Sequence, residues 1–192
     1  MSVYELARKN RSYRAFDESR RITREELLDL VECARLCPSS VNRQPLKYYL
    51  AWEREETERI LALTRWARAL PDLTLPPPGR HPTAFLVIVQ DLSVDPSLTR
   101  YQKDVGIVAQ TMLLAAAEKG LGGCMIGNFD PGPLGELLGL SEQYAPLLVV
   151  ALGKPDETIV LTDLGPDGDT NYYRDAAGVH YVPKRKLEDL IF

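Results

Sequence analysis

Apolar residues recur at helical spacing along the first part of the chain. Residues 3–10 predict a short amphipathic helix. A second helix has a sharp start, because Thr23 opens a Thr-x-x-Glu capping box, and it ends before Pro38. Residues 53–70 predict a third amphipathic helix. The five prolines of residues 71–82 exclude regular structure after it.

Continuous apolar runs predict the strands. Residues 83–90 and 146–152 each have the composition of a strand buried on both faces, and residues 47–52 predict a further strand. Residues 104–119 predict a long helix that is apolar almost all round and therefore central. A short helix is expected near residues 134–138. Together these elements predict an α+β domain in which helices cover a small mixed sheet.

The C-terminal part of the chain has a different pattern. Residues 153–183 are polar and predict little regular structure, and a loop of that length is unusual inside a compact domain. We therefore expect an arm that lies on a partner subunit. The chain then ends in the apolar residues of the segment Leu187–Phe192. No repeat or composition shift marks a boundary, so residues 1–192 are expected to form one domain.

Composition excludes several classes of protein. The chain is 45% hydrophobic and 26% charged with a net charge of −4, and its cations are scattered among acids, so we expect no nucleic-acid partner. The longest apolar run, residues 84–89, is far shorter than the about 20 residues of a membrane span. Three cysteines argue against a disulfide framework, and we assign them structural roles. These features predict a cytoplasmic protein with no membrane association.

Motifs for catalysis by side chains are missing. The chain has two histidines and no HExxH, paired CxxC, GxGxxG, Walker or Gly-x-Ser-x-Gly motif. Nothing indicates a metal site. Acid–base and nucleophilic chemistry therefore have no obvious carrier, which favours an organic cofactor as the source of the chemistry.

Three segments are candidates for binding such a cofactor. Residues 11–14, Arg-Ser-Tyr-Arg, offer two guanidinium groups and a hydroxyl for a phosphate, or they form a solvated basic helix end. Residues 38–45, PSSVNRQP, offer hydroxyls and amides for a uracil-like ring edge, or they form an ordinary polar turn. Residues 183–186, Pro-Lys-Arg-Lys, suit a phosphate, or they begin the last helix.

The order of these segments resembles the FMN-dependent nitroreductase family. The resemblance covers nearly the whole chain: RSYRAF, PSS-x-N-x-QP about 25 residues later, EKGLGGCMIGNFD, VALGKP and HYVPKRKLEDLI. It implies a three-layer helix–sheet–helix sandwich with a mixed, mainly antiparallel sheet. It also implies a homodimer with swapped terminal arms, here residues 153–192, and two FMN molecules at the interface.

The resemblance assigns the residues that would bind FMN. Arg11 and Ser12 correspond to the phosphate side, and Arg14 to the N1 and C2-carbonyl region. The following segments complete the implied site: Pro38, Ser39, Ser40 and Asn42 from the other subunit, the strand end at Ile126, Gly127 and Asn128 facing N5 and O4, and Lys184 and Arg185 at the phosphate. Many relatives carry a second arginine where this chain has Asn10, so the phosphate is expected to depend more on the terminal basic pair.

The implied activity is that of an NAD(P)H-dependent oxidoreductase. A hydride would pass from NADH or NADPH to flavin N5, then to a nitroaromatic, quinone or other small electrophilic acceptor, by ping-pong kinetics. No residue is assigned as catalytic, because the flavin carries the chemistry. The alternatives are a specialised flavin enzyme, such as a dehydrogenase, a dehalogenase or a flavin-fragmenting enzyme, and a non-catalytic flavin-binding protein.

Overall fold

Strand β3 (Ala84–Asp91) is the centre of the fold, and all eight of its residues are buried. The computed structural model describes residues 1–192. Strands β2 (Leu46–Ala51) and β5 (Tyr144–Pro155) flank β3, and β4 (Gly122–Ile126) and β1 (Phe16–Asp17) pair with β5. Every one of these pairings is antiparallel. The main sheet is therefore not mixed, whereas a mixed, mainly antiparallel sheet was expected.

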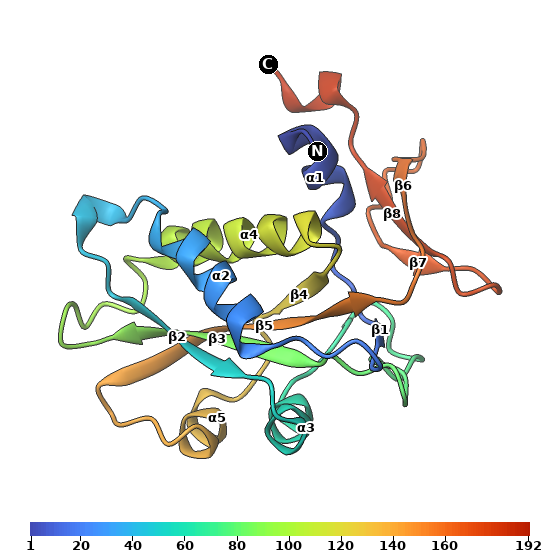
Figure 1. Cartoon of the computed structure of the whole chain (residues 1–192). Helices are drawn as coiled ribbons and strands as arrows, with labels where there is room; N and C mark the ends of the chain where they lie inside the picture. The colour runs from blue at the N-terminus through green and yellow to red at the C-terminus, as the bar shows by residue number, and fades with distance from the viewer.

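Helices cover both faces of this sheet (Figure 1). Helices α2 (Arg24–Arg35) and α4 (Gln102–Glu118) lie on one face, and α3 (Arg54–Ala62) and α5 (Pro131–Leu137) lie on the other. Successive residues of a strand point to opposite faces. Accordingly, alternate residues of β3 enter two separate cores: Ala84, Leu86 and Ile88 on the α2–α4 side, and Phe85, Val87 and Val89 on the α3–α5 side. The three-layer α+β sandwich is confirmed.

The helix signals read from the sequence are borne out in detail at α2. Thr23 accepts a hydrogen bond from Glu26 N, and the Glu26 carboxylate accepts one from Thr23 N, which is the expected capping box. Helix α4 ends at Glu118, and Gly120 follows it with a φ of 76°, which lets Leu121 N donate to Ala116 O. Helix α1 (Val3–Lys9) is capped by a similar box that begins at Ser2.

The sequence predicted that the helix at residues 104–119 is apolar almost all round and central. In the structure, α4 is buried on one side only. It buries one side in the α2–α4 core, with Met112 and Ala116 inaccessible. Ile107 on the opposite side is 39% exposed, and Leu114 is half-buried. A single chain therefore leaves the apolar side chain of Ile107 exposed on the outer side of its longest helix.

The third predicted helix is also shorter than residues 53–70. Helix α3 ends at Ala62, because Thr64 forms a β-bridge with Phe129 and Arg65 N donates to Asn128 O. These contacts direct residues 64–68 away from a helical path. The proline-rich residues 71–82 contain no helix or strand, as expected.

The prediction that residues 153–183 are nearly structureless is wrong. Strand β5 continues to Pro155, and a second sheet contains β6 (Ile159–Asp163), β7 (Tyr173–Arg174) and β8 (His180–Lys184). Strands β6 and β8 are parallel, while β7 and β8 are antiparallel. The paired residues of β6 and β8 are about twenty positions apart in the sequence, so a short stretch of sequence shows no sign of this pairing. The polar stretch therefore has the sequence pattern of a loop.

The last residues of the chain lie away from the main sheet. A short 3-10 helix (Leu187–Leu190) follows β8, and Figure 1 shows it outside the layers of the sandwich. Leu187, Leu190, Ile191 and Phe192 are all exposed in one chain. No helix has the length and apolar character needed to cross a membrane.

Candidate functional site

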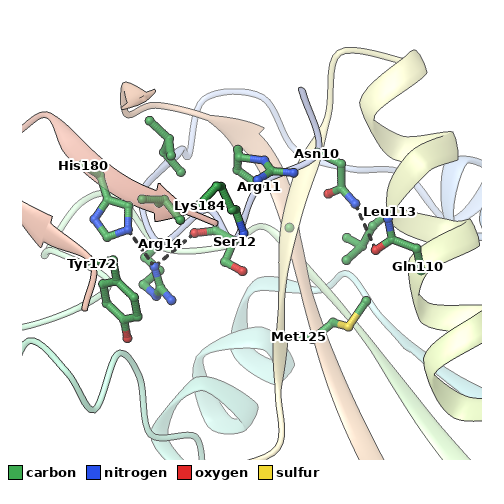
Figure 2. A pocket seen from close by; sticks show the side chains of 13 residues that line it. Asn10, Arg11, Ser12, Arg14, Gln110, Leu113, Met125, Tyr172, His180 and Lys184 are labelled. Carbon is green, nitrogen blue, oxygen red and sulfur yellow. Dashed lines mark hydrogen bonds between the residues drawn. The ribbon is translucent and has the colours of Figure 1, made fainter. Parts of the chain in front are cut away.

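A cavity of about 320 Å³ lies where the N-terminal segment meets α4, β4 and the small sheet (Figure 2). Residues 10–14 cross this region in extended form, and Ser12 forms a parallel bridge with Gly123. Asn10 is buried, and its Nδ2 donates to Gln110 Oε1 on α4 at 3.3 Å. The side chains that line the cavity include Asn10, Arg11, Ser12, Arg14, Gln110, Leu113, Met125, Ile159, Tyr172, His180, Val182 and Lys184.

All charged side chains that line this cavity are positive. Arg11, Arg14 and Lys184 line it, and no carboxylate does. Burial lowers the pKa of Arg11 from its ordinary value, which marks the environment as partly desolvated. The Nε atoms of Arg11 and Arg14 are buried and have no hydrogen-bond partner in the chain. Since buried polar groups are normally paired, this cavity suits an anionic ligand.

The Arg14 side chain is held from several directions. Its guanidinium carbon lies 4.8 Å from the centroid of the Tyr172 ring, and its Nη1 donates to Ser12 O at 3.3 Å. Its backbone N–H donates to Glu157, which also forms a buried ion pair with Arg174. The contacts with Tyr172 and Ser12 hold the guanidinium at the cavity wall, and the hydrogen bond to Glu157 fixes the backbone of Arg14.

The side chain of His180 lies next to that of Arg14. Its Nε2 is 3.4 Å from Arg14 Nη1, and its ring lies 5.2 Å from that of Tyr172. Burial, together with the charges of Arg14 and Arg174, lowers the pKa of His180 to about 4. The imidazole is therefore neutral at neutral pH, and its buried Nδ1 has no partner. It offers one further hydrogen-bonding atom to a ligand.

A second, smaller cavity adjoins the first at the end of β4. It measures about 170 Å³ and shares Arg14, Met125 and Tyr172 with the larger one. Ile126, Gly127 and Asn128 line it, together with residues 65–68. A Cβ added at Gly127 would meet no atom within 4 Å, so open space lies over this backbone.

The PSS segment lies at neither of these cavities. Pro38 and Ser39 line a separate cavity of about 220 Å³ near the start of α4. The hydroxyls of Ser39 and Ser40 donate to the buried Asp104 at 2.7 and 2.9 Å. Burial alone would raise the pKa of Asp104, but the hydrogen bonds from these serines outweigh it and lower the pKa. Asn42 is exposed at the tip of the segment.

The structure thus gathers some of the expected residues and separates others. Arg11, Ser12, Arg14 and Lys184 line the main cavity, and the strand end 126–128 lines the adjoining one. Arg185 is exposed and lines neither, since successive residues of an extended chain point in opposite directions. The residues of segment 38–42 are elsewhere in the same chain.

Sequence reasoning did not find several residues of the site. His180 lies shortly after a glycine in a polar stretch that has the sequence pattern of a loop, and only the structure shows that it begins β8. Tyr172 and Glu157 lie in the stretch interpreted as structureless, and no local pattern distinguishes them. Asp104 stands out in the sequence only as the first residue of a predicted helix.

Comparison with known proteins identifies the family. The nitroreductase family pattern matches residues 7–154. The chain belongs to the nitroreductase family. Among curated relatives, a protein of Archaeoglobus fulgidus, provisionally named NADH dehydrogenase/NAD(P)H nitroreductase, is 27% identical over 156 residues, which are 77% of this chain and 82% of the relative.

Solved structures of nitroreductases have the same fold. A nitroreductase family protein from Clostridium novyi superimposes with a TM-score of 0.66 at 21% identity, covering 81% of this chain and 87% of that one. An FMN-dependent nitroreductase from Clostridium difficile gives a TM-score of 0.64 at 20% identity, covering 81% and 88%. The family expected from the sequence is confirmed, and the chain is an oxidoreductase of the nitroreductase family.

Proposed function

We propose that this nitroreductase-family chain binds FMN and works as a homodimeric NAD(P)H-dependent oxidoreductase on small electrophilic acceptors. The observation that carries the proposal is the main cavity, where Arg11, Arg14 and Lys184 stand without a carboxylate and with buried Nε atoms unpaired. FMN offers a dianionic phosphate and a polar ring edge, which suit these groups. The names of two matched proteins point the same way, one to FMN and one to NAD(P)H.

Each residue would have a distinct role toward the cofactor. Arg11 and Lys184 would neutralise the phosphate, with Ser12 beside them. Arg14, anchored by Tyr172 and Glu157, would stabilise negative charge at the N1 and C2-carbonyl edge. The open backbone at residues 126–128 would face the N5 edge.

The chemistry that FMN supplies when bound is uptake of a hydride from reduced nicotinamide and its delivery to an acceptor. No carboxylate or charged imidazole lines the main cavity, so the protein contributes binding, orientation and fixed positive charge. Because donor and acceptor would use the same site in turn, ping-pong kinetics follow. Nitroaromatics and quinones are the acceptors proposed.

The proposed homodimer accounts for two features of one chain. Ile107 is exposed on the outer side of α4, and the residues of Leu187–Phe192 are exposed. A twofold interface would bury such surfaces. Pro38, Ser39, Ser40 and Asn42, which lie apart from the main cavity of their own chain, would then reach the cofactor of the partner.

The visible spectrum of the purified protein tests this function. We expect a flavin spectrum that NADH or NADPH bleaches without oxygen, and chromatography of the heat-released cofactor should identify FMN. FAD alone, or no flavin after reconstitution, would contradict the proposal. A flavin that neither nicotinamide reduces would instead favour a binding protein without this activity.

A further inference from the structure

The segment that follows α3 builds one wall of the smaller cavity. Residues 65–68, Arg-Trp-Ala-Arg, face the strand end 126–128 across a space of about 170 Å³. Two backbone contacts hold the segment there, the Thr64–Phe129 bridge and the hydrogen bond from Arg65 N to Asn128 O at 2.9 Å. This wall is therefore attached to the strand end proposed to face the cofactor.

Cations dominate this cavity as well. Arg65 and Arg68 line it, and neither side chain forms an ion pair within the chain. With Arg14 they bring three arginines to one small space, and no carboxylate lines it. The nearby Asp130 instead caps α5, where its carboxylate accepts from Gly132 N at 3.2 Å.

The segment is also held in a specific conformation. Ala67 has a φ of 43°, in the left-handed region that is unfavourable for a residue with a Cβ. Trp66 donates from Nε1 to Thr64 Oγ1 at 2.8 Å, which fixes its indole at the cavity wall. Strained backbone of this kind is a feature of ligand sites, and here it accompanies unpaired cations and an aromatic surface.

We propose that Arg65, Trp66 and Arg68 form a subsite for the carboxylate of an aromatic acceptor. The inference rests on the proposed function, and it names the class of acceptor: a planar ring that carries both an acidic group and the electrophilic group. Guanidinium groups bind carboxylates by charge-assisted hydrogen bonds, and the indole offers a face for the ring.

A small acid fits this position better than the phosphates of the electron donor. The cavity shares Arg14 and Met125 with the proposed cofactor site, so a group bound there is close to the reacting edge. In NADH or NADPH the phosphates are many bonds away from the nicotinamide carbon that gives the hydride. A carboxylate on the same ring as a nitro group has no such separation.

Kinetics with two matched acceptors test the subsite. The probes are 4-nitrobenzoate and its neutral analogue 4-nitrobenzamide; in each, the hydride of NADPH and a proton convert the nitro group to nitroso, releasing water and NADP⁺. We expect a KM at least about tenfold lower for the benzoate in the wild-type holoenzyme. The double variant Arg65→Gln/Arg68→Gln should lose that preference while keeping its activity on the benzamide.

An equilibrium measurement and a control variant show whether a lost preference for the benzoate comes from weaker binding of the carboxylate. Calorimetry with benzoate, which is not reduced, should give binding to the wild type and at least about tenfold weaker binding to the double variant. Arg24→Gln removes another exposed arginine without an ionic partner, at the start of α2, and should change neither result.

Three results would overturn the subsite: equal KM values for the two acceptors in the wild type, a preference that survives the double substitution, or a loss confined to the KM of NADPH. The last result would assign the arginines to a phosphate of the donor. If the protein carried no flavin and oxidised no NAD(P)H, the proposed function would fail, while the benzoate calorimetry would still decide the subsite.

Discussion

Arg14 is the charged residue that lines both cavities. Its guanidinium lines both, packs over Tyr172 and lies 3.4 Å from the neutral His180. A cation that is fixed before a ligand arrives loses little entropy on binding it. The position of this side chain therefore leads to predictions that single substitutions can test.

Substitution of the two arginines should separate cofactor affinity from cofactor potential. Arg14→Met should lower the two-electron potential of bound FMN by tens of millivolts, because a charge-assisted hydrogen bond is worth about 1.5–3 kcal/mol and ~30 mV corresponds to about 1.4 kcal/mol. Arg11→Met should weaken FMN binding with little change in potential, since both redox states feel a phosphate contact equally. Dye-equilibrated potentiometry and FMN titration measure the two effects. Equal potentials in wild type and Arg14→Met would contradict this placement of Arg14.

His180 should make stability depend on pH in a defined window. Its pKa is about 4 in the fold and 6.5 for an unperturbed histidine, so between these values the unfolded chain binds a proton that the folded chain does not. Its contribution is complete above about pH 6.5 and is lost as the pH falls toward 4, by about 2 kcal/mol at about pH 5. Urea unfolding at about pH 7, 6 and 5 should show that the free energy of unfolding falls less with decreasing pH in His180→Gln than in the wild type.

At the scale of elements, close backbone approach decides where β4 and β5 lie. Gly123 of β4 is paired with Leu152 of β5, and a Cβ at Gly123 would stand 2.2 Å from Ala151 O and 2.7 Å from Leu113 Cδ2. The Ala151 oxygen belongs to the backbone and cannot yield without moving the sheet. The glycine thus brings the helix, the strand and the bridge to Ser12 together beneath the main cavity.

Two Gly→Ala substitutions should therefore have opposite effects on stability. Gly123→Ala should destabilise the fold by about 2–3 kcal/mol through overpacking. Gly135→Ala, inside α5 with no atom within 4 Å of its Cβ position, should stabilise it by about 0.5–1 kcal/mol. Thermal or urea unfolding of both variants measures the difference. A stable Gly123→Ala protein with an unaltered cavity would show that the sheet is more adaptable than these contacts suggest.

Asp104 links α4 to the loop before β2. It accepts hydrogen bonds from Ser39 Oγ, Ser40 N and Ser40 Oγ, so Asp104→Asn removes the negative charge that these donors share. We expect a loss of about 1–3 kcal/mol in the free energy of unfolding. Ser39→Ala removes one of the three donors, so it should lower the free energy of unfolding by a smaller amount. Loss of equal size in both variants would argue against a shared network.

At the scale of the whole molecule, the uncovered surfaces are the informative feature. The outer side of α4 and the terminal residues after Lys186 include apolar side chains that are exposed in one chain. Exposed apolar surface of this kind commonly marks an interface. The homodimer is the proposal that covers both.

A matched pair of substitutions tests that interface. Ile107 on α4 and Leu28 on α2 are 39% and 40% exposed, so an aspartate at either should cost one chain a similar amount of stability. Ile107→Asp should convert the dimer to a monomer and reduce FMN retention, whereas Leu28→Asp should leave the dimer intact. Light scattering at micromolar concentration, with the flavin content of each species, gives the answer. A flavin-loaded wild-type monomer would contradict the proposed dimer.

The sequence by itself determined the parts of the fold that depend on short-range signals. The capping box at Thr23, the fully apolar run of β3 and the glycine that ends α4 each act within a few residues, and each element formed where expected. The order of the RSYR, PSS and PKRK segments was enough to predict the family.

Only the tertiary structure decided what depends on distant partners. Helix α3 stops where Thr64 pairs with Phe129, and the polar stretch after Pro155 becomes a sheet because β6 and β8 meet across about twenty residues. The main cavity joins Arg14 to Glu157, Tyr172 and His180, which lie far away along the chain. No local pattern specifies such contacts, because their energy comes from burial and pairing that exist only once the chain has folded.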